Sequence, residues 1–398
     1  MQADAGLSEE DCQAGTEAVA RYAQAVLQPK WARPERPVPL AECRQALDGL
    51  AALGLQDDTL GLWAEPGTAL GRRWSLSALA QVGRVSGALA LQMHTEALAR
   101  HLDRLLDRQA GLAAGHDAPG PALVVLQGHQ GLGREAVAAL CSGQALSDEH
   151  AAMLADNWGW PQAHTPRPVH ALPDWAALWC PTWTVAEGWV WHRLPRQVLT
   201  VQADERGMGL DELSVQQVAA VPGRDAVQAL ATATLRGPVA RQAWAQLQAL
   251  QALGLWAITQ AGAQRAAAMA HEQAHLRRQG GAVIAQHPAV QQLLSLAHGT
   301  AREAAHALQQ QAQAPQLLAA AGQGLRELWR ARAQHQQRLS QGVSAALQVF
   351  GGMGYMQDTG MERWLRQTHH LRLLGGSPAE LQACVAWWDT WTDLEACA

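Results

Sequence analysis

The sequence predicts a mainly α-helical protein with a small β-domain in the middle of the chain. Alanine and glutamine, which lose little free energy on entering a helix, are used heavily throughout the 398 residues. Seven of the 17 tryptophans fall between Trp158 and Trp191, in a stretch that prolines interrupt. Hydrophobic residues make up 48% of the chain, which excludes a wholly disordered protein.

The first part of the chain, residues 1–140, is expected to form an N-terminal helical domain. Its clearest helical signal is the stretch from Ser77 to Arg108, where leucines recur at helical spacing. A proline-rich connector, Trp31–Pro39, separates earlier helices from it.

The middle part, residues 145–225, is expected to form a reduced β-domain, a small barrel or sheet. Trp189–Leu194 and Gln197–Gln202 combine β-branched and aromatic residues between turn signals, which is typical of strands.

The last part, residues 228–398, is expected to form an antiparallel four-helix bundle, because long helical patterns are joined by short connections. Pro238 suits the first turn of the first helix, and Gly280 and Gly281 would close that helix. The four expected helices run from Pro238 towards Arg278, from Pro288 to Gln313, from Pro315 to Val349, and onward from Pro378.

Composition also narrows the class of protein. The formal net charge of −5 argues against a nucleic-acid partner. No run of 18 apolar residues predicts a membrane span, and the acidic start does not resemble a signal peptide. The six cysteines are scattered without a CxxC pair, so we expect a reduced, cytoplasmic protein.

Three motifs could carry chemistry, and the first is His271-Glu272-Gln273-Ala274-His275. Two histidines four residues apart share one helix face and could bind zinc, while Glu272 would activate a water molecule. Such a protein would be a zinc hydrolase. No third ligand is evident, and a solvated helix face explains the same pattern, so no metal site is expected.

The second motif is the strand-like segment Ala122–Gln127 followed by Gly131-x-Gly133-x-x-Ala136. This spacing matches the fingerprint that places a dinucleotide pyrophosphate at a helix N-terminus. Repeated alternation of strands and helices is missing, however, so a loop before a short helix is the competing interpretation.

The third motif is the segment Gln348–Tyr355, which contains the sole Phe, one of two Tyr, and Gly351, Gly352 and Gly354. Glycines permit close backbone approach or positive φ, so the backbone N–H groups here could hold phosphate oxygens. An interhelical turn with a hydrophobic plug fits the residues equally well.

The segment Ala346–Asp358, followed by Met361–Arg366, resembles the C-terminal signature of the acyl-CoA dehydrogenases. Upstream, Arg277–Gln291 is similar to a second motif of that family, and the segment Leu50–Leu55 and the helix Ser86–His101 are also similar. The resemblance is specific over the last 170 residues and spans nearly the whole chain.

This resemblance implies FAD bound between the middle and C-terminal domains, in a homodimer or homotetramer whose subunits share the cofactor. It implies that Arg277 pairs with the FAD pyrophosphate and that Ser377 lies near FAD. Gln348, Gly351 and Gly352 would contact the adenosine-diphosphate part of a partner subunit's FAD.

The chain departs from the family at the catalytic base, a glutamate that takes the α-proton of the acyl thioester. Gly375 stands where most members have it. Members that carry the base on the first bundle helix have it near Leu250–Leu253, where this chain has Gln251. Glu380 is the nearest carboxylate in sequence and the remaining candidate. The family's middle-domain flavin segments are not recognisable, and Met208–Leu213 only weakly echoes one of them.

The sequence therefore predicts an acyl-CoA dehydrogenase-like flavoprotein for the α,β-dehydrogenation of an acyl-CoA or related thioester. Its electrons would pass to electron-transfer flavoprotein or another acceptor, and fatty acid metabolism would be its context. The alternative is a non-catalytic paralogue that serves as a partner or assembly subunit.

Overall fold

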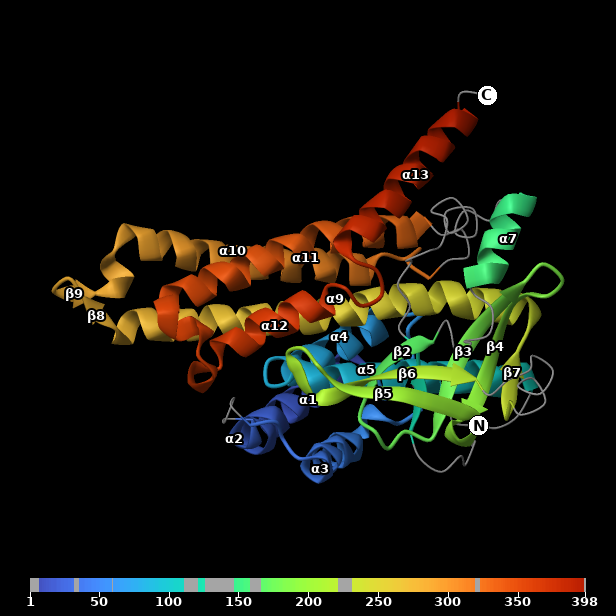
Figure 1. Ribbon diagram of the computed structural model, residues 1–398, viewed down its shortest axis with the longest axis horizontal. Coiled ribbons are helices and arrows are strands. Elements are labelled where there is room, and N and C mark those ends of the chain that lie inside the picture. Colours follow the sequence, from blue (N-terminus) through green and yellow to red (C-terminus); the bar gives the residue numbers. More distant parts are fainter. Residues whose placement is uncertain are drawn as a thin grey trace.

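A computed structural model describes residues 7–31, 36–58, 60–110, 121–125, 147–157, 166–220, 231–318 and 323–396. Within them the chain forms N-terminal helices, a middle region of β-sheets and a long C-terminal bundle (Figure 1). The predicted fold class is therefore confirmed. No helix in these ranges combines the length and apolarity needed to cross a membrane.

The N-terminal helices begin at defined caps. Ser8 forms a capping box with Asp11 at the start of α1, and Thr68 accepts the Gly71 N–H at the start of α4. The stretch from Ser77 to Arg108 divides between two helices, because the Ser86 hydroxyl accepts the Leu89 N–H at 3.2 Å and starts a new one. The helices are α1 (Glu9–Tyr22), α2 (Gln28–Lys30), α3 (Leu40–Leu50), α4 (Ala69–Gly83), α5 (Gly87–Ala110) and α7 (Asp148–Asn157).

The middle region contains two sheets that pack on each other. One has the strand order β1-β3-β4-β7 and the other β2-β6-β5. A small apolar core that includes Leu123, Trp175 and Leu178 from one side and Val169 and Val218 from the other fills the space between them. The strands are β1 (Ala122–Val124), β2 (Arg167–Ala171), β3 (Ala177–Thr184), β4 (Gly188–Pro195), β5 (Leu199–Gly207), β6 (Leu210–Ala220) and β7 (Ala233–Leu235).

Both predicted strands are present, with one shifted boundary. The first lies within β4, which pairs antiparallel with β3. In the second, residues 196–198 form a 3-10 turn and β5 begins at Leu199. The glycine motif Gly131-x-Gly133-x-x-Ala136 lies outside the described residues.

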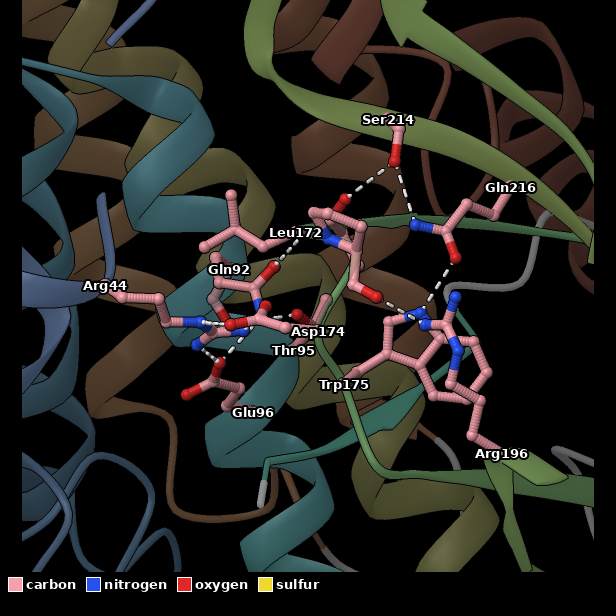
Figure 2. Close-up of polar contacts among 12 residues, drawn as sticks. Arg44, Gln92, Thr95, Glu96, Leu172, Asp174, Trp175, Arg196, Ser214 and Gln216 are labelled. Atoms are coloured by element: carbon pink, nitrogen blue, oxygen red, sulfur yellow. Dashed lines mark hydrogen bonds and ion pairs between the residues drawn. The ribbon is translucent and has the colours of Figure 1, made fainter. Parts of the chain in front are cut away.

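Polar contacts join the N-terminal helices to the middle sheets (Figure 2). Gln92 of α5 accepts the Leu172 N–H at 3.0 Å and donates to Glu96 at 2.7 Å. Arg44 of α3 bridges Glu96 and Asp174. Because Glu96 is only 3% exposed, its charge depends on these partners for compensation.

The C-terminal bundle follows the prediction closely and adds one helix. α10 (Pro288–Gln313) has the predicted bounds, and α9 (Gly237–Leu276) differs by few residues. The third predicted helix, Pro315–Val349, corresponds to α11 (Gln323–Phe350), which begins eight residues later because residues 315–318 form a turn. The fourth corresponds to α13 (Pro378–Ala396). An additional helix, α12 (Met361–Leu371), packs against α9 and α11, while α13 packs against α11 and projects from the bundle (Figure 1).

Helix α9 is the centre of the molecule. Every residue from Leu247 to Ala263 is buried, and α4, α5, α10, α11 and α12 all pack against it. Its approach to α5 is close at Gly254, where an added Cβ would lie 2.2 Å from His94 Cε1. A hydrogen bond also holds the His94 ring, because Trp63 Nε1 donates to His94 Nδ1 at 3.0 Å.

We expect Gly254→Ala to lower the free energy of unfolding by about 1–3 kcal/mol, the usual cost of overpacking a core. The His94 ring is fully buried and cannot move away from the new methyl group. Urea denaturation would measure the change. Gly299→Ala is the matched control, because no atom lies within 4 Å of its added Cβ. Equal stability of the two variants would contradict the close α5–α9 contact.

Two buried histidines of α5 predict a loss of stability in acid. Burial lowers the pKa of His94 to about 3 and that of His101 to about 4, against an ordinary value of 6.5. As pH falls below 6.5, the unfolded chain binds protons that the folded chain refuses. Stability is therefore full above pH 6.5 and falls by up to about 1.4 kcal/mol per pH unit per histidine.

Urea denaturation at pH 7 and pH 5 checks this expectation. His94→Gln keeps an oxygen acceptor for Trp63 and should reduce the acid-induced loss. His306→Gln removes an exposed histidine of α10 and should leave that loss unchanged. A loss of the same size in both variants would rule out His94 as a source.

Candidate functional site

Arg277, Gln348 and Gly351, which lie far apart in sequence, line one surface cavity of about 460 Å³. Arg277 caps the end of α9, and its Nη1 donates to the Phe350 carbonyl at 2.9 Å. This bond joins the ends of α9 and α11. The resemblance implied an FAD contact for each of these residues, and the fold brings them to one cavity.

Glycines shape this cavity. Gly351 has φ +62°, and a Cβ there would lie 3.4 Å from Arg277 Nη1. Gly280 and Gly281, with φ +61° and +83°, form the turn between β8 (Arg278–Gln279) and β9 (Ala282–Val283). A Cβ on Gly352 would meet nothing within 4 Å, so that backbone is open to a ligand.

The cavity has the character of an anion site. In the described part of the chain, the Arg277 guanidinium bonds only to neutral oxygens of Phe350 and Gln279 and forms no ion pair. Gln279 and His287 also line the cavity, although the sequence analysis did not single them out. Their closeness in sequence to the Gly280-Gly281 pair is the sequence feature that points to them. A fixed cation, amide groups and open backbone fit a diphosphate.

The loop after α12 holds Gly375 against α9. Gly375 is buried with φ +63°, and a Cβ there would lie 2.3 Å from Gln251 Nε2 and 2.9 Å from Leu255 Cδ1. The two positions at which the family resemblance placed a base are thus neighbours in space. One is a glycine and the other a neutral amide.

A buried arginine fixes this loop. Arg332 of α11 has no exposed surface, and its Nη1 donates to the Gly375 carbonyl at 2.8 Å while Nη2 donates to Leu374. Burial lowers the pKa of Arg332 to about 9, and the charge of Glu380 opposes that shift. Because Arg332 donates hydrogen bonds to the carbonyls of both Leu374 and Gly375, it stabilises the left-handed backbone conformation of Gly375.

Ser377 and Glu380 form the start of α13. The Ser377 N–H donates to Glu380 Oε2 at 2.6 Å, and the Glu380 N–H donates to the Ser377 hydroxyl at 3.3 Å. This reciprocal pair is a capping box. The structure therefore gives Ser377 and Glu380 a cap role, and Glu380 commits one carboxylate oxygen to it.

The zinc motif lies elsewhere, on an exposed face of α9. His275 Nδ1 bonds to the His271 carbonyl at 2.9 Å, and Glu272 pairs with Arg265 at 3.5 Å. Among the described residues, no group of three or more histidines, cysteines or acids is placed to hold a metal ion. His271, Glu272 and His275 are exposed on this helix face.

Between the middle sheets and the bundle, the segment Met208–Leu213 packs directly on α12. A Cβ on Gly209 would lie 2.3 Å from the backbone nitrogen of Gln367. Asp211 pairs with Arg366 at 3.0 Å, and Glu212 pairs with Arg363 at 2.8 Å. The Glu212 and Arg363 side chains are both under 10% exposed, so this boundary is firmly joined.

Comparisons with known proteins agree with this architecture. Residues 244–384 match the family model described as acyl-CoA dehydrogenase, C-terminal domain. A search of curated proteins finds no match.

Solved structures resemble nearly the whole chain. A glutaryl-coenzyme A dehydrogenase in complex with glutaryl-CoA is 14% identical with a TM-score of 0.68, covering 96% of each chain. Butyryl-CoA dehydrogenase from Megasphaera elsdenii is 14% identical with a TM-score of 0.64, covering 96% of this chain and 99% of that chain. PigA with FAD and proline is 14% identical with a TM-score of 0.68, covering 96% and 98%. The C-terminal domain therefore belongs to the acyl-CoA dehydrogenase family, and the chain as a whole has that family's fold.

Proposed function

We propose that this protein is an FAD-dependent flavoprotein that oxidises an acyl-CoA or a related thioester between its α- and β-carbons. The observation that carries the proposal is the cavity in which Arg277, Gln348 and Gly351 meet. The shared fold with a glutaryl-CoA complex and an FAD complex supports the substrate class and the cofactor. FAD, when bound, supplies the acceptor for the hydride that leaves the β-carbon.

Each residue of the cavity has a role that its chemistry suits. Arg277 would neutralise the pyrophosphate, and Gln348 would bind the adenosine-diphosphate part through its amide. Gly351 and Gly352 would let that part approach the backbone closely. Because this cavity lies at the end of the bundle and opens to the surface, we propose that a partner subunit contributes the FAD held there. The protein would then be a homodimer or homotetramer.

The buried loop at Gly375 favours a second candidate function. Position 375 is a glycine, position 251 is a neutral amide and Glu380 is engaged in a cap, so none of these three described positions offers a free carboxylate for proton abstraction. A non-catalytic paralogue that retains FAD and serves as a partner subunit fits these residues. Flavin reduction by acyl-CoA thioesters separates the two candidates, and electron-transfer flavoprotein is the acceptor to test for the enzyme.

We place the protein in the cytoplasm, in fatty acid metabolism.

Purified protein should be yellow, with about one FAD per chain. Arg277→Gln should weaken FAD binding by roughly tenfold to a hundredfold, because a charge-assisted hydrogen bond to phosphate contributes about 1.5–3 kcal/mol. Equilibrium dialysis against FAD would measure this. Arg278→Gln is the matched control, since Arg278 does not line the cavity. A colourless protein that gains no flavin on reconstitution would refute the proposal.

Gln251→Glu should place a carboxylate beside Gly375 without changing side-chain size. If the base alone is missing, flavin reduction by acyl-CoA should accelerate by about 10²-fold or more, the usual contribution of a general base. Gln251→Met is the neutral control. Gly375→Glu is a poorer probe, because its Cβ would meet Gln251 and its φ is positive. No gain over Gln251→Met, in protein with full flavin, would favour the non-catalytic candidate.

A further inference from the structure

A second cavity lies outside the site described above. It has a volume of about 400 Å³ and lies between α4, α9 and α10, on the flank of the bundle. Its size falls within the usual range of pockets for small organic ligands. None of its lining residues takes part in the proposed cofactor site.

The walls divide into an apolar part and a polar part. Leu76 and Ala80 of α4 and Leu308 and Ala312 of α10 supply aliphatic surface. Five glutamines, two arginines and a serine supply the polar surface, and no lining residue is acidic. This cavity therefore combines aliphatic walls with donors and a positive charge.

The two arginines differ in their pairing. Arg73 forms an ion pair with Glu9 of α1. Arg84 bonds only to neutral amide oxygens in the described part of the chain, donating to Gln264 at 2.9 Å and weakly to Gln81 at 3.4 Å. Arg84 is exposed at the edge of the cavity, and among the described residues no acid pairs with its guanidinium. A carboxylate matches the geometry of that guanidinium.

We propose that this cavity binds an aliphatic carboxylate, with the carboxylate on Arg84 and the hydrocarbon chain against Leu76, Ala80 and Leu308. The site is separate from the proposed FAD cavity, which forms beyond the C-terminal end of α9 and shares no lining residue with it. The inference does not depend on the proposed oxidation.

Isothermal titration of the purified, flavin-loaded protein with octanoate tests the proposal. We expect saturable binding of one octanoate per chain. Arg84→Gln should weaken it at least tenfold, because the charge is lost while the side chain keeps an amide. Ala80→Leu should weaken it similarly by filling the wall from α4. Arg302→Gln, which changes an exposed arginine of α10 outside the cavity, should bind octanoate as the unchanged protein does.

Thermal unfolding of each variant confirms that the fold is retained. Octanol, which has the same chain without the charge, should bind at least tenfold more weakly than octanoate. The proposal is wrong if octanoate does not saturate, or if folded Arg84→Gln and Ala80→Leu both bind it with unchanged affinity. The proposal is also wrong if octanoyl-CoA displaces octanoate while Arg84→Gln leaves octanoate binding unchanged. Octanoate would then bind in a thioester site instead of this cavity.

Discussion

The close contact of α5 with the buried helix α9 is the constraint on which the rest of the molecule depends. A Cβ on Gly254 would collide with the His94 ring, and Trp63 Nε1 donates to His94 Nδ1. Trp63 has φ +57°, the only positive φ outside glycine in the described residues. Such strain persists only where surrounding contacts over-determine the backbone. Here the Trp63 carbonyl accepts from Arg104 of α5 and its N–H donates to Ser75 of α4, so these two helices hold Trp63 in place.

The same tight packing decides the chemistry available at the loop after α12. Because α9 is enclosed along its middle, the loop can approach it only through a residue without a side chain, and Gly375 meets that requirement. Gln251 and Leu255 occupy the space that a larger residue would need. Arg332 then holds the Leu374 and Gly375 carbonyls from inside the bundle. The glycine at position 375 is therefore embedded in the packing, and a carboxylate is accommodated more easily on α9 than in the loop.

The charged boundary between the middle sheets and α12 complements this packing. Glu212 accepts from Arg363 and from the Trp31 indole, so one buried carboxylate ties three distant segments together. Breaking such a buried pair leaves an uncompensated charge and costs several kcal/mol. Arg44 has a similar function at the other side of the middle region, between Glu96 and Asp174. These contacts fix how the sheets sit against both sets of helices.

Much of the fold was predictable from local patterns, because helix periods, prolines and glycine turns act over a few residues. The bounds of α10 and the strand within β4 follow from such signals. Motif resemblance pointed to Arg277 and to the Gln348–Tyr355 segment separately, and the fold joined them in one cavity. The separate helix α12 and the capping role of Glu380 were not foreseen, since both depend on what the segment packs against. Sequence by itself determined the order of helices and strands, the presence of an arginine at position 277 and of glycines at positions 351 and 352, and the absence of an acid at positions 375 and 251. Only the tertiary structure decided that these two positions touch, that Arg332 holds the loop and that Arg84 faces a cavity, because each contact joins helices that are distant along the chain.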